Sequence, residues 1–440
     1  MKLHIRLHLI LKPFRNSKYR PLLLAAGLLL GGCNALPAWC AESAGSRVPA
    51  AQEETKKLPA ALEEAKKLPG LPECTGQMPL SYAEEFRVDY YGEDYALITI
   101  HSDDRYLLVS EGADVPADLP EDITVLQKPL EHIYAASSSC PDFFRQLGAL
   151  DAVTMTSTQA KDWTIVPIRK AAEREDMIYV VKYSAPDYEY ICDEGCSLAI
   201  ENTMIYHAPQ VMEMLERLGI PVLCEYSSYE EEPLGRLEWI RLYGLMTDRQ
   251  EAADSYFEEQ LSRMREVLDS DGHFGRPAPE AGQEETASDR EESTEAADVV
   301  FFYIASNGSV NVRREEDYVS RMIDMAGGRY LLHDVVADLP AAESHTGSVS
   351  LQMESFYAAA RDADVLIYNG TLGEPLEHLD ELLRKSPLLA DFKAVKNGRV
   401  YCSRESLFQE VTGTCRMIED FFHVIRQHEE EDLIYLRKLD

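Results

Sequence analysis

The chain has 440 residues, of which 45% are apolar, so it can form two or three domains with substantial cores. It carries 77 Asp and Glu against 43 Lys and Arg, a formal net charge of −34. This balance excludes a protein that neutralises nucleic-acid phosphates over a broad surface. Nine cysteines in a chain of this length exclude a small disulfide scaffold. The only stretch apolar enough for a membrane lies at the extreme N-terminus, which excludes a multi-span protein.

Residues 1–32 have the pattern of a signal peptide. Six Lys and Arg and no acid occupy residues 1–20, and an uncharged apolar run follows at 22–30. Leu30-Gly31-Gly32-Cys33 then resembles a bacterial lipobox, in which cleavage precedes a cysteine that takes a lipid. We therefore expect lipidation of Cys33 and anchoring on the extracytoplasmic face of the cell membrane. An uncleaved signal anchor or ordinary cleavage near residue 41 fits less well.

Residues 33–79 predict a disordered tether, because Ala, Glu, Lys and Pro dominate and no apolar periodicity appears. A first α/β lobe is predicted over 80–233. Two alternating apolar runs at 95–100 and 106–110 indicate a β-hairpin at its start. The clearest later unit is a strand at 198–200, a helix that begins near Pro209, and a strand at 220–224, which is a βαβ unit with a parallel sheet.

A helical linker is predicted over 234–268, and residues 270–297 form an acidic segment rich in Gly, Pro, Ser and Thr, which predicts a disordered insertion. The α/β pattern resumes over 298–440 as a second lobe. The predicted fold is therefore α/β, with two Rossmann-like lobes whose central sheets are mostly parallel, a long joining helix and an added N-terminal β-hairpin. Ligands of open parallel sheets bind beyond the carboxyl ends of the strands, so we expect a cleft between the lobes.

Several segments together resemble the substrate-binding lipoproteins of ABC importers of the helical-backbone type, which serve iron-siderophore, haem and cobalamin uptake. The segments in the first lobe and the linker are residues 183–189, 197–204, 207–223 and 233–240. Those in the second lobe are residues 325–328 and 354–367. The resemblance covers about residues 120–440, and it depends on the order and spacing of the segments, since each is short.

The resemblance implies a permease partner and two docking acids. In the family, each lobe carries an exposed Glu that pairs with an Arg of the permease. Glu189, eight residues before Ser197, and Glu354, ten residues before Asp364, match these positions. A carboxylate–guanidinium pair is charge-assisted and often bidentate, which suits orientation of a partner. The alternative is that both are ordinary acids on helix surfaces.

Polar and aromatic side chains near the predicted strand ends are the candidate ligand contacts. They are Ser138, Trp163, Tyr183, Asn202, Thr203, Tyr229, Ser306, Asn307, Arg313, Asn369 and Arg404. The Arg residues are included because a carboxylate-bearing siderophore or haem would need one or two of them. The resemblance implies a small metal chelate as cargo, an iron complex first and haem or a corrinoid as alternatives. We expect a monomer with no cofactor of its own and no nucleic-acid partner.

Catalytic and metal motifs are absent from the sequence. It lacks Gly-x-Ser-x-Gly, His-Glu-x-x-His and the phosphate-binding Gly-x-x-x-x-Gly-Lys-Ser/Thr. Cys192 and Cys196 lack a second close pair, so we expect small buried side chains more readily than zinc ligands, and a disulfide stays open. His207 is the one histidine near a predicted cleft loop. We therefore predict a non-enzyme. A surface sensor or interaction lipoprotein with the same fold, or an enzyme such as a chelatase, is the alternative.

Overall fold

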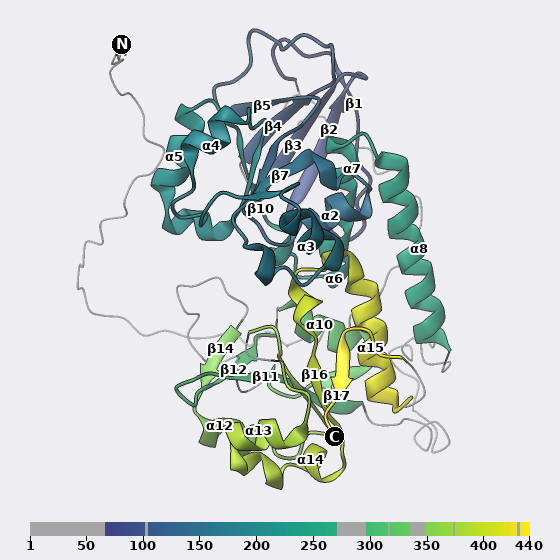
Figure 1. The fold of residues 1–440 in the computed structure, drawn as a ribbon. Coiled ribbons are helices and arrows are strands. Elements are labelled where there is room, and N and C mark those ends of the chain that lie inside the picture. Colours follow the sequence, from purple (N-terminus) through teal and green to yellow (C-terminus); the bar gives the residue numbers. More distant parts are fainter. Residues whose placement is uncertain are drawn as a thin grey trace, which may run out of the picture. The chain divides into compact units, whose positions relative to one another are not determined.

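The computed structural model describes residues 67–101, 104–270, 296–315, 317–333, 335, 348–372, 375–428 and 432–440. The predicted signal peptide, Cys33 and nearly all of the predicted acidic insertion lie outside the described residues. The chain divides after Leu58 into two units, and every described residue belongs to the second, Pro59–Asp440. Figure 1 shows the elements of this unit.

Five strands form the first sheet, in the order β1-β2-β3-β4-β5. They are β1 (Cys74–Gln77), β2 (Phe86–Tyr91), β3 (Tyr95–Ile100), β4 (Asp104–Val109) and β5 (Ile123–Gln127). Strands β1 to β4 are antiparallel and β5 is parallel to β4. The hairpin predicted from the two apolar runs is β3–β4, and the structure embeds it in this larger sheet. Apolar clusters cover both faces of the sheet.

Strand β1 corrects the predicted tether, which was drawn to residue 79. Its residues are mostly exposed, and it pairs with β2 at the edge of the sheet. An exposed polar edge strand has no apolar alternation, so the sequence pattern gives no sign of it.

The second sheet is wholly parallel, in the order β10-β9-β6-β7-β8. Its strands are β6 (Ile133–Ala135), β7 (Val153–Thr156), β8 (Ile178–Tyr179), β9 (Ala199–Asn202) and β10 (Val222–Glu225). Its helices are α2 (Cys140–Gln146), α3 (Val166–Glu173), α4 (Tyr188–Asp193) and α5 (Pro209–Arg217). The predicted βαβ unit is β9–α5–β10, in which Pro209 opens the helix and buried Val211 and Leu215 face the sheet.

The predicted helical linker consists of three helices. They are α6 (Pro233–Glu238), α7 (Ile240–Met246) and α8 (Gln250–Asp269). Helix α8 buries one stripe, from Ala253 to Leu268, with a spacing of three or four residues. It packs against α7 and against the last helix, α15 (Thr414–Arg426), and so joins the two lobes.

The third sheet has parallel strands at its centre and antiparallel strands at its flanks. Strands β11 (Ala297–Ile304), β15 (Val365–Tyr368), β16 (Val400–Ser403) and β13 (Gly328–Tyr330) pair in parallel. Strands β12 (Val310–Arg313), β14 (Ser348–Leu351) and β17 (Leu436–Lys438) pair antiparallel. The other helices of this lobe are α10 (Tyr318–Met325), α12 (Met353–Ala360), α13 (Leu379–Lys385) and α14 (Lys393–Lys396). The predicted α/β class is confirmed.

Short 3-10 turns follow several strands and helices. They are η1 (Leu150–Ala152), η2 (Ala160–Asp162), η3 (Thr203–His207), η4 (Ser227–Tyr229), η5 (Pro387–Asp391), η6 (Glu405–Phe408) and η7 (Val411–Gly413).

Two buried glutamates fasten the first sheet to α6. The carboxylate of Glu238 accepts hydrogen bonds of 2.8–3.0 Å from the backbone N–H groups of residues 81–83. Glu230 accepts bonds of 2.8 and 3.0 Å from those of residues 84–85. Buried carboxylates are stable only when their oxygens are satisfied, and here the backbone leading into β2 supplies the donors. The sheet is therefore a fixed part of the first lobe.

Candidate functional site

The carboxyl ends of β6, β9 and β10 lie together because these three strands are neighbours in the parallel second sheet. The chain leaves β6 through three serines, 137–139, the last of which is the N-cap residue of α2. It leaves β9 at Asn202 and enters η3, and it leaves β10 at Glu225 just before η4. This edge of a parallel sheet is where ligands bind, so it is the first-lobe part of the candidate site.

Glu225 organises this edge from inside the protein. Its side chain is buried, and one carboxylate oxygen accepts hydrogen bonds from the hydroxyls of Ser137 and Ser139 at 3.1 and 3.2 Å. The other oxygen accepts from the backbone N–H of Ser227 at 3.0 Å. The end of β6 is thereby tied to the end of β10. The sequence analysis named Ser138, which is exposed, and missed its two neighbours, which turn inward.

Two of the predicted ligand residues meet directly. The hydroxyls of Thr203 and Tyr229 lie 2.7 Å apart, which joins η3 to η4. The neighbouring Asn202 uses its side-chain oxygen to accept from the backbone N–H of Met204 at 2.9 Å, and so caps η3. Asn202, Thr203 and Tyr229 are all half-buried, so each keeps an exposed portion at the sheet edge.

The other two predicted ligand residues of the first lobe, Tyr183 and Trp163, pack against apolar clusters. Tyr183 is half-buried and packs against the apolar cluster that surrounds the second sheet. Trp163 is only 1% exposed and belongs to the main core. Because its indole ring is buried, Trp163 does not form an open wall of a ligand cleft in this structure. A large aromatic residue between polar neighbours can be either a core residue or a residue that contacts a ligand, and the sequence alone does not distinguish these two roles.

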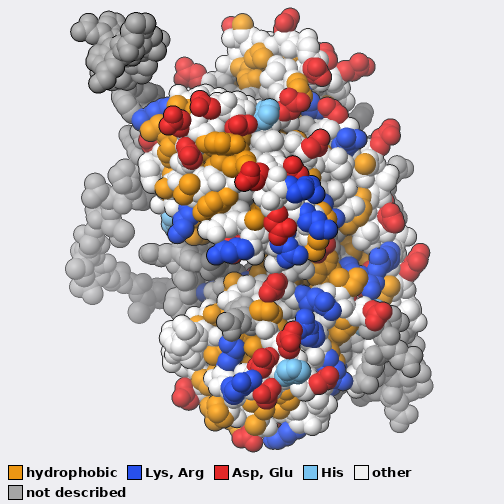
Figure 2. Space-filling view, viewed as in Figure 1, with side chains coloured by type: hydrophobic (Ala, Val, Ile, Leu, Met, Phe, Trp, Pro, Cys, Tyr) orange, Lys and Arg blue, Asp and Glu red, His pale blue; other side chains and the backbone are white. Residues whose placement is uncertain are grey.

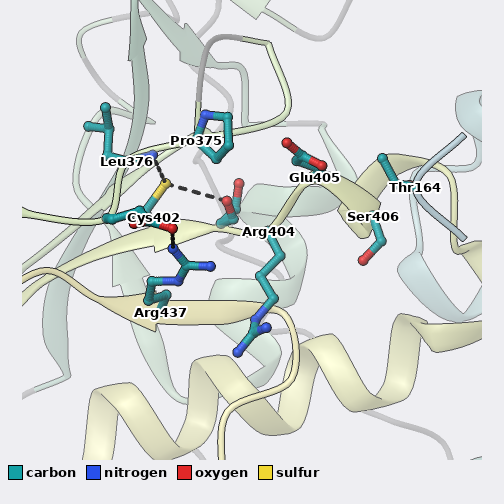
Figure 3. A pocket seen from close by; sticks show the side chains of 10 residues that line it. Thr164, Pro375, Leu376, Cys402, Arg404, Glu405, Ser406 and Arg437 are labelled. Atoms are coloured by element: carbon teal, nitrogen blue, oxygen red, sulfur yellow. Dashed lines mark hydrogen bonds and ion pairs between the residues drawn. The ribbon is translucent and has the colours of Figure 1, made fainter. Parts of the chain in front are cut away.

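A pocket of about 340 Å³ lies at the carboxyl ends of the second-lobe strands (Figure 3). Residues 375–377, which follow β15, and residues 402–406, from the end of β16 into η6, form most of its lining. Arg437 of β17 and Thr164, which stands just before α3 of the first lobe, complete it. Arg404 is the only predicted ligand residue among those that line it.

Charges in this pocket are close to balanced. Arg437 forms an ion pair of 3.1 Å with Glu377, and the lining also contains one further residue of each charge, Arg404 and Glu405. Burial raises the pKa of the Cys402 thiol, whose sulfur accepts a hydrogen bond from the backbone N–H of Leu376 at 3.4 Å. The thiol is therefore neutral. This lining suits a polar group without a large net charge.

The remaining second-lobe predictions do not converge on the pocket. Asn369 is buried and its side-chain oxygen accepts from the backbone N–H of Thr371 at 3.1 Å. Ser306 and Asn307 are exposed in the loop between β11 and β12. Arg313 forms an ion pair of 3.4 Å with Asp317 inside the lobe and lies 4.9 Å from the ring centre of Phe408. These partners leave the Arg313 guanidinium little freedom to bind a ligand.

The two predicted docking acids occupy matching local positions. Glu189 lies in the first turn of α4, and Glu354 lies in the first turn of α12. Both side chains are exposed. In the view of Figure 1, α4 and α12 both lie on the side away from α8. An acid in the first turn of a helix is also favoured by the helix dipole, so the position alone does not establish docking.

A segment that we call the interlobe strap, residues 409–413, connects the second lobe to the first. The side-chain oxygen of Gln409 accepts from the backbone N–H and the hydroxyl of Thr164, at 2.9 and 2.6 Å. Buried Asp142 of α2 accepts from the backbone N–H and the hydroxyl of Thr412, at 2.8 and 2.7 Å. The sequence analysis missed the strap, because Gln and Thr before a helix have no signal that distinguishes them from ordinary loop residues.

Two rings and a histidine near the predicted site were also missed. His101, in the turn between β3 and β4, stacks on Tyr226 with ring centres 4.8 Å apart, and Tyr206 of η3 reaches the same ring. The histidine comes from a different sheet, far along the chain, so only the fold brings it here. Cys192 and Cys196 are free thiols, and His207 is exposed on η3.

Within the described residues, no group of three or more His, Cys, Asp or Glu side chains is placed to hold a metal ion. None of the helices in the described ranges has the length and apolar character needed to cross a bilayer.

Comparison of the whole sequence with known protein families finds no matching family model. Two curated relatives are lipoproteins of Methanocaldococcus jannaschii without a characterised function. One is 21% identical over 359 residues, covering 75% of this chain and 77% of the relative. The other is 23% identical over 369 residues, covering 81% of this chain and 86% of the relative.

Solved structures similar to this chain are periplasmic binding proteins. A haem-binding protein of Pseudomonas aeruginosa has a TM-score of 0.49 at 15% identity and covers 70% of this chain and 98% of its own. A haem-binding protein of Vibrio cholerae has a TM-score of 0.48 at 17% identity, with 66% and 97% covered. A vitamin B12-binding protein of Vibrio cholerae has a TM-score of 0.45 at 14% identity, with 69% and 99% covered.

Proposed function

We propose that this chain is the extracytoplasmic substrate-binding lipoprotein of an ABC importer, of the helical-backbone type. It captures a small metal chelate, an iron complex first, and delivers it to the permease without making or breaking a bond. The observation that carries the proposal is the pair of α/β lobes joined by α8, each of which has an exposed Glu in the first turn of a helix.

The proposed anchor is the lipid on Cys33. The lipobox-like sequence supports it, and so do the names of the curated relatives, which are lipoproteins. A net charge of −34 repels anionic lipid headgroups, so the surface of the protein would not hold it at a membrane. A lipid chain together with a flexible tether would supply that attachment.

Uptake by intact cells tests the docking role of the two acids. Reversal of both charges, Glu189→Arg with Glu354→Arg, should abolish delivery to the permease, because each carboxylate would become a cation facing an Arg of the partner. The affinity of the purified protein for its cargo should stay within twofold of wild type. Native mass spectrometry of protein isolated from its own cells identifies that cargo for the affinity measurement.

The matched control reverses two exposed acids of α8, Glu251→Arg with Glu266→Arg, which changes the net charge by the same amount. Uptake should then persist. Normal uptake by the Glu189 and Glu354 variant would contradict the docking role of these two acids. Uptake that is unchanged when this chain is deleted from the cells would contradict the importer proposal, and cargo binding retained in that case would favour a surface sensor with the same fold.

A further inference from the structure

An aromatic surface lies at the ends of β9 and β10, and we call it the tyrosine platform. It consists of Tyr206, Tyr226 and Tyr229, with His101 stacked on one side. The ring centres of Tyr226 and Tyr229 are 5.4 Å apart, and those of Tyr206 and Tyr226 are 6.5 Å apart. The Tyr226 hydroxyl donates to that of Tyr206 at 3.0 Å. The planes of His101 and Tyr226 differ by only 11°, whereas the rings of Tyr206 and Tyr229 are tilted from that of Tyr226 by 52° and 50°.

The platform is fixed in position yet open to solvent. Tyr229 is held by its 2.7 Å hydrogen bond to Thr203, and His101 is held by Glu85, whose carboxylate lies 2.6 Å from Nδ1. Tyr206 is nevertheless 39% exposed, and the neighbouring Met204 is 46% exposed. Large apolar side chains held rigid at a ligand-binding edge lose little conformational entropy when a ligand packs on them.

The charges around the platform are negative. The Glu85 carboxylate pairs with His101 at the side of the platform. Burial raises the pKa of Tyr226 to about 12, and the Asp104 carboxylate adds to that shift. Among the described residues, no Lys or Arg forms a hydrogen bond, an ion pair or a cation–π contact with the three rings. On the face shown in Figure 2, Lys and Arg side chains are spread over both lobes, and several of them lie around α3.

We propose that the rings of the tyrosine platform pack against a metal chelate that is uncharged or cationic. This rests on the proposed function and narrows its cargo, because it disfavours polyanionic chelates. The negative face of an aromatic ring attracts a cation within about 6 Å of its centre, and an uncharged macrocycle gains stacking and dispersion energy there. A polyanion would meet carboxylates at the same edge, where the basic side chain of His101 is already paired with Glu85.

Two planar three-ring dyes of opposite charge test the platform without knowledge of the natural cargo. The probes are methylene blue, which carries one positive charge, and resorufin, which carries one negative charge. Their binding is measured by equilibrium dialysis in about 0.15 M salt, because this salt screens the long-range attraction between the dye and the charged protein. We expect methylene blue to bind at least tenfold more tightly than resorufin. The substitutions Tyr206→Leu and Tyr226→Leu should each weaken methylene blue binding at least fivefold.

The matched control is Tyr179→Leu at the opposite edge of the second sheet, since Tyr179 is 36% exposed against 39% for Tyr206. All three variants keep the net charge, so nonspecific attraction of the dye stays constant. The control should bind methylene blue within twofold of wild type. Circular dichroism of each variant verifies that it is folded. Equal affinity for the two dyes, or less than a twofold effect of both platform variants, overturns the proposal.

Titration with two candidate cargoes distinguishes a failure of the platform proposal from a failure of the importer proposal. Calorimetric titration compares cyanocobalamin, an uncharged corrinoid, with a ferric tris-catecholate of charge −3. Tight binding of the catecholate that is unaffected by Tyr226→Leu would overturn the platform as the cargo site and leave the importer proposal intact. Selective methylene blue binding that depends on Tyr226, in a protein whose deletion leaves cargo uptake unchanged, would support the platform and contradict the importer proposal.

Discussion

The two lobes present different chemistry at the ends of their parallel strands. In the first lobe, buried Glu225 fixes two serine hydroxyls and a backbone N–H, and aromatic rings stand beside it. In the second lobe, the pocket is lined by surface ion pairs such as Arg437–Glu377, whose side chains are 40% and 70% exposed. Buried, fully bonded groups keep their geometry, whereas exposed pairs rearrange at little cost. The first lobe is therefore the pre-organised half of the site, and the second is the adaptable half.

A second contrast exists within the first lobe, between two buried glutamates on adjacent strands. Glu225 of β10 has three donors, while Glu201 of β9 has no hydrogen-bond partner for either oxygen among the described residues. Burial raises the pKa of Glu201 to about 8. The hydroxyl of nearby Tyr134 is also buried without a partner in that part of the chain. The first lobe thus contains one position, that of Glu201, where a charged carboxylate is strongly unfavourable.

The largest expected effect concerns the pH dependence of stability at Glu201. Its pKa is about 8 when folded, against an ordinary value of 4.5 when unfolded, so the folded state holds the proton more tightly. This contribution to the free energy of unfolding is complete below about pH 4.5 and is lost as the pH rises towards 8, at up to about 1.4 kcal/mol per pH unit. Glu201→Gln removes the titration. Its stability relative to wild type should therefore rise by about 3 kcal/mol from pH 5 to pH 8.

Urea denaturation at several pH values measures this difference. Other buried acids also make the stability of wild type and of Glu201→Gln depend on pH, among them Asp420, whose pKa is raised by burial to about 6. These contributions are the same in the two proteins, so the difference in stability between wild type and Glu201→Gln reports on Glu201. Glu194→Gln, at an exposed position after α4, should show a constant difference across the same range. A constant difference for Glu201→Gln as well would mean that Glu201 is hydrated and charged in the folded protein.

Removal of the Glu225 carboxylate should have the next largest effect. Glu225→Leu leaves two hydroxyls and one backbone N–H without their acceptor, which we expect to lower the free energy of unfolding by about 2–3 kcal/mol. The matched change in the second lobe, Glu405→Leu at an exposed position, should alter it by less than about 0.5 kcal/mol. Similar losses for the two variants, measured by urea denaturation, would contradict the contrast between the lobes.

Local patterns predicted the elements of this fold better than the site. The β3–β4 hairpin and the β9–α5–β10 unit follow from apolar periodicity and from Pro209, which act over a few residues. The site depends on contacts between distant segments, as when His101 reaches Tyr226 or Asp142 reaches Thr412. No pattern of residue spacing in the sequence indicates these contacts. Among the residues taken from strand ends, Asn202, Thr203 and Tyr229 lie at the edge of the second sheet and Trp163 lies in the core, while the inward-facing serines and the rings of Tyr206 and Tyr226 were missed.

The interlobe strap offers a smaller test of how firmly the halves are joined. Thr412→Val keeps the shape of the side chain but removes the hydroxyl that donates to Asp142 and accepts from Arg145 at 3.0 Å. Asp142 keeps its bond to the backbone N–H of residue 412, so we expect a loss of only about 1–2 kcal/mol in the free energy of unfolding. Exposed Thr75→Val should change it by less than about 0.5 kcal/mol. A loss no greater than that of the control would show that the strap hydroxyl is not engaged in solution.

The smallest effect is expected at the second-lobe ion pair. Arg437 and Glu377 lie 3.1 Å apart with both side chains substantially exposed, and such pairs contribute about 0–1 kcal/mol. A double-mutant cycle with Arg437→Gln and Glu377→Gln should give a coupling of no more than about 0.5 kcal/mol, which vanishes in 1 M salt because the charges are screened. A coupling above about 1.5 kcal/mol that persisted in high salt would mean that the pair is shielded from solvent. The second lobe would then be pre-organised like the first, and the adaptable half of the site would have to be sought elsewhere.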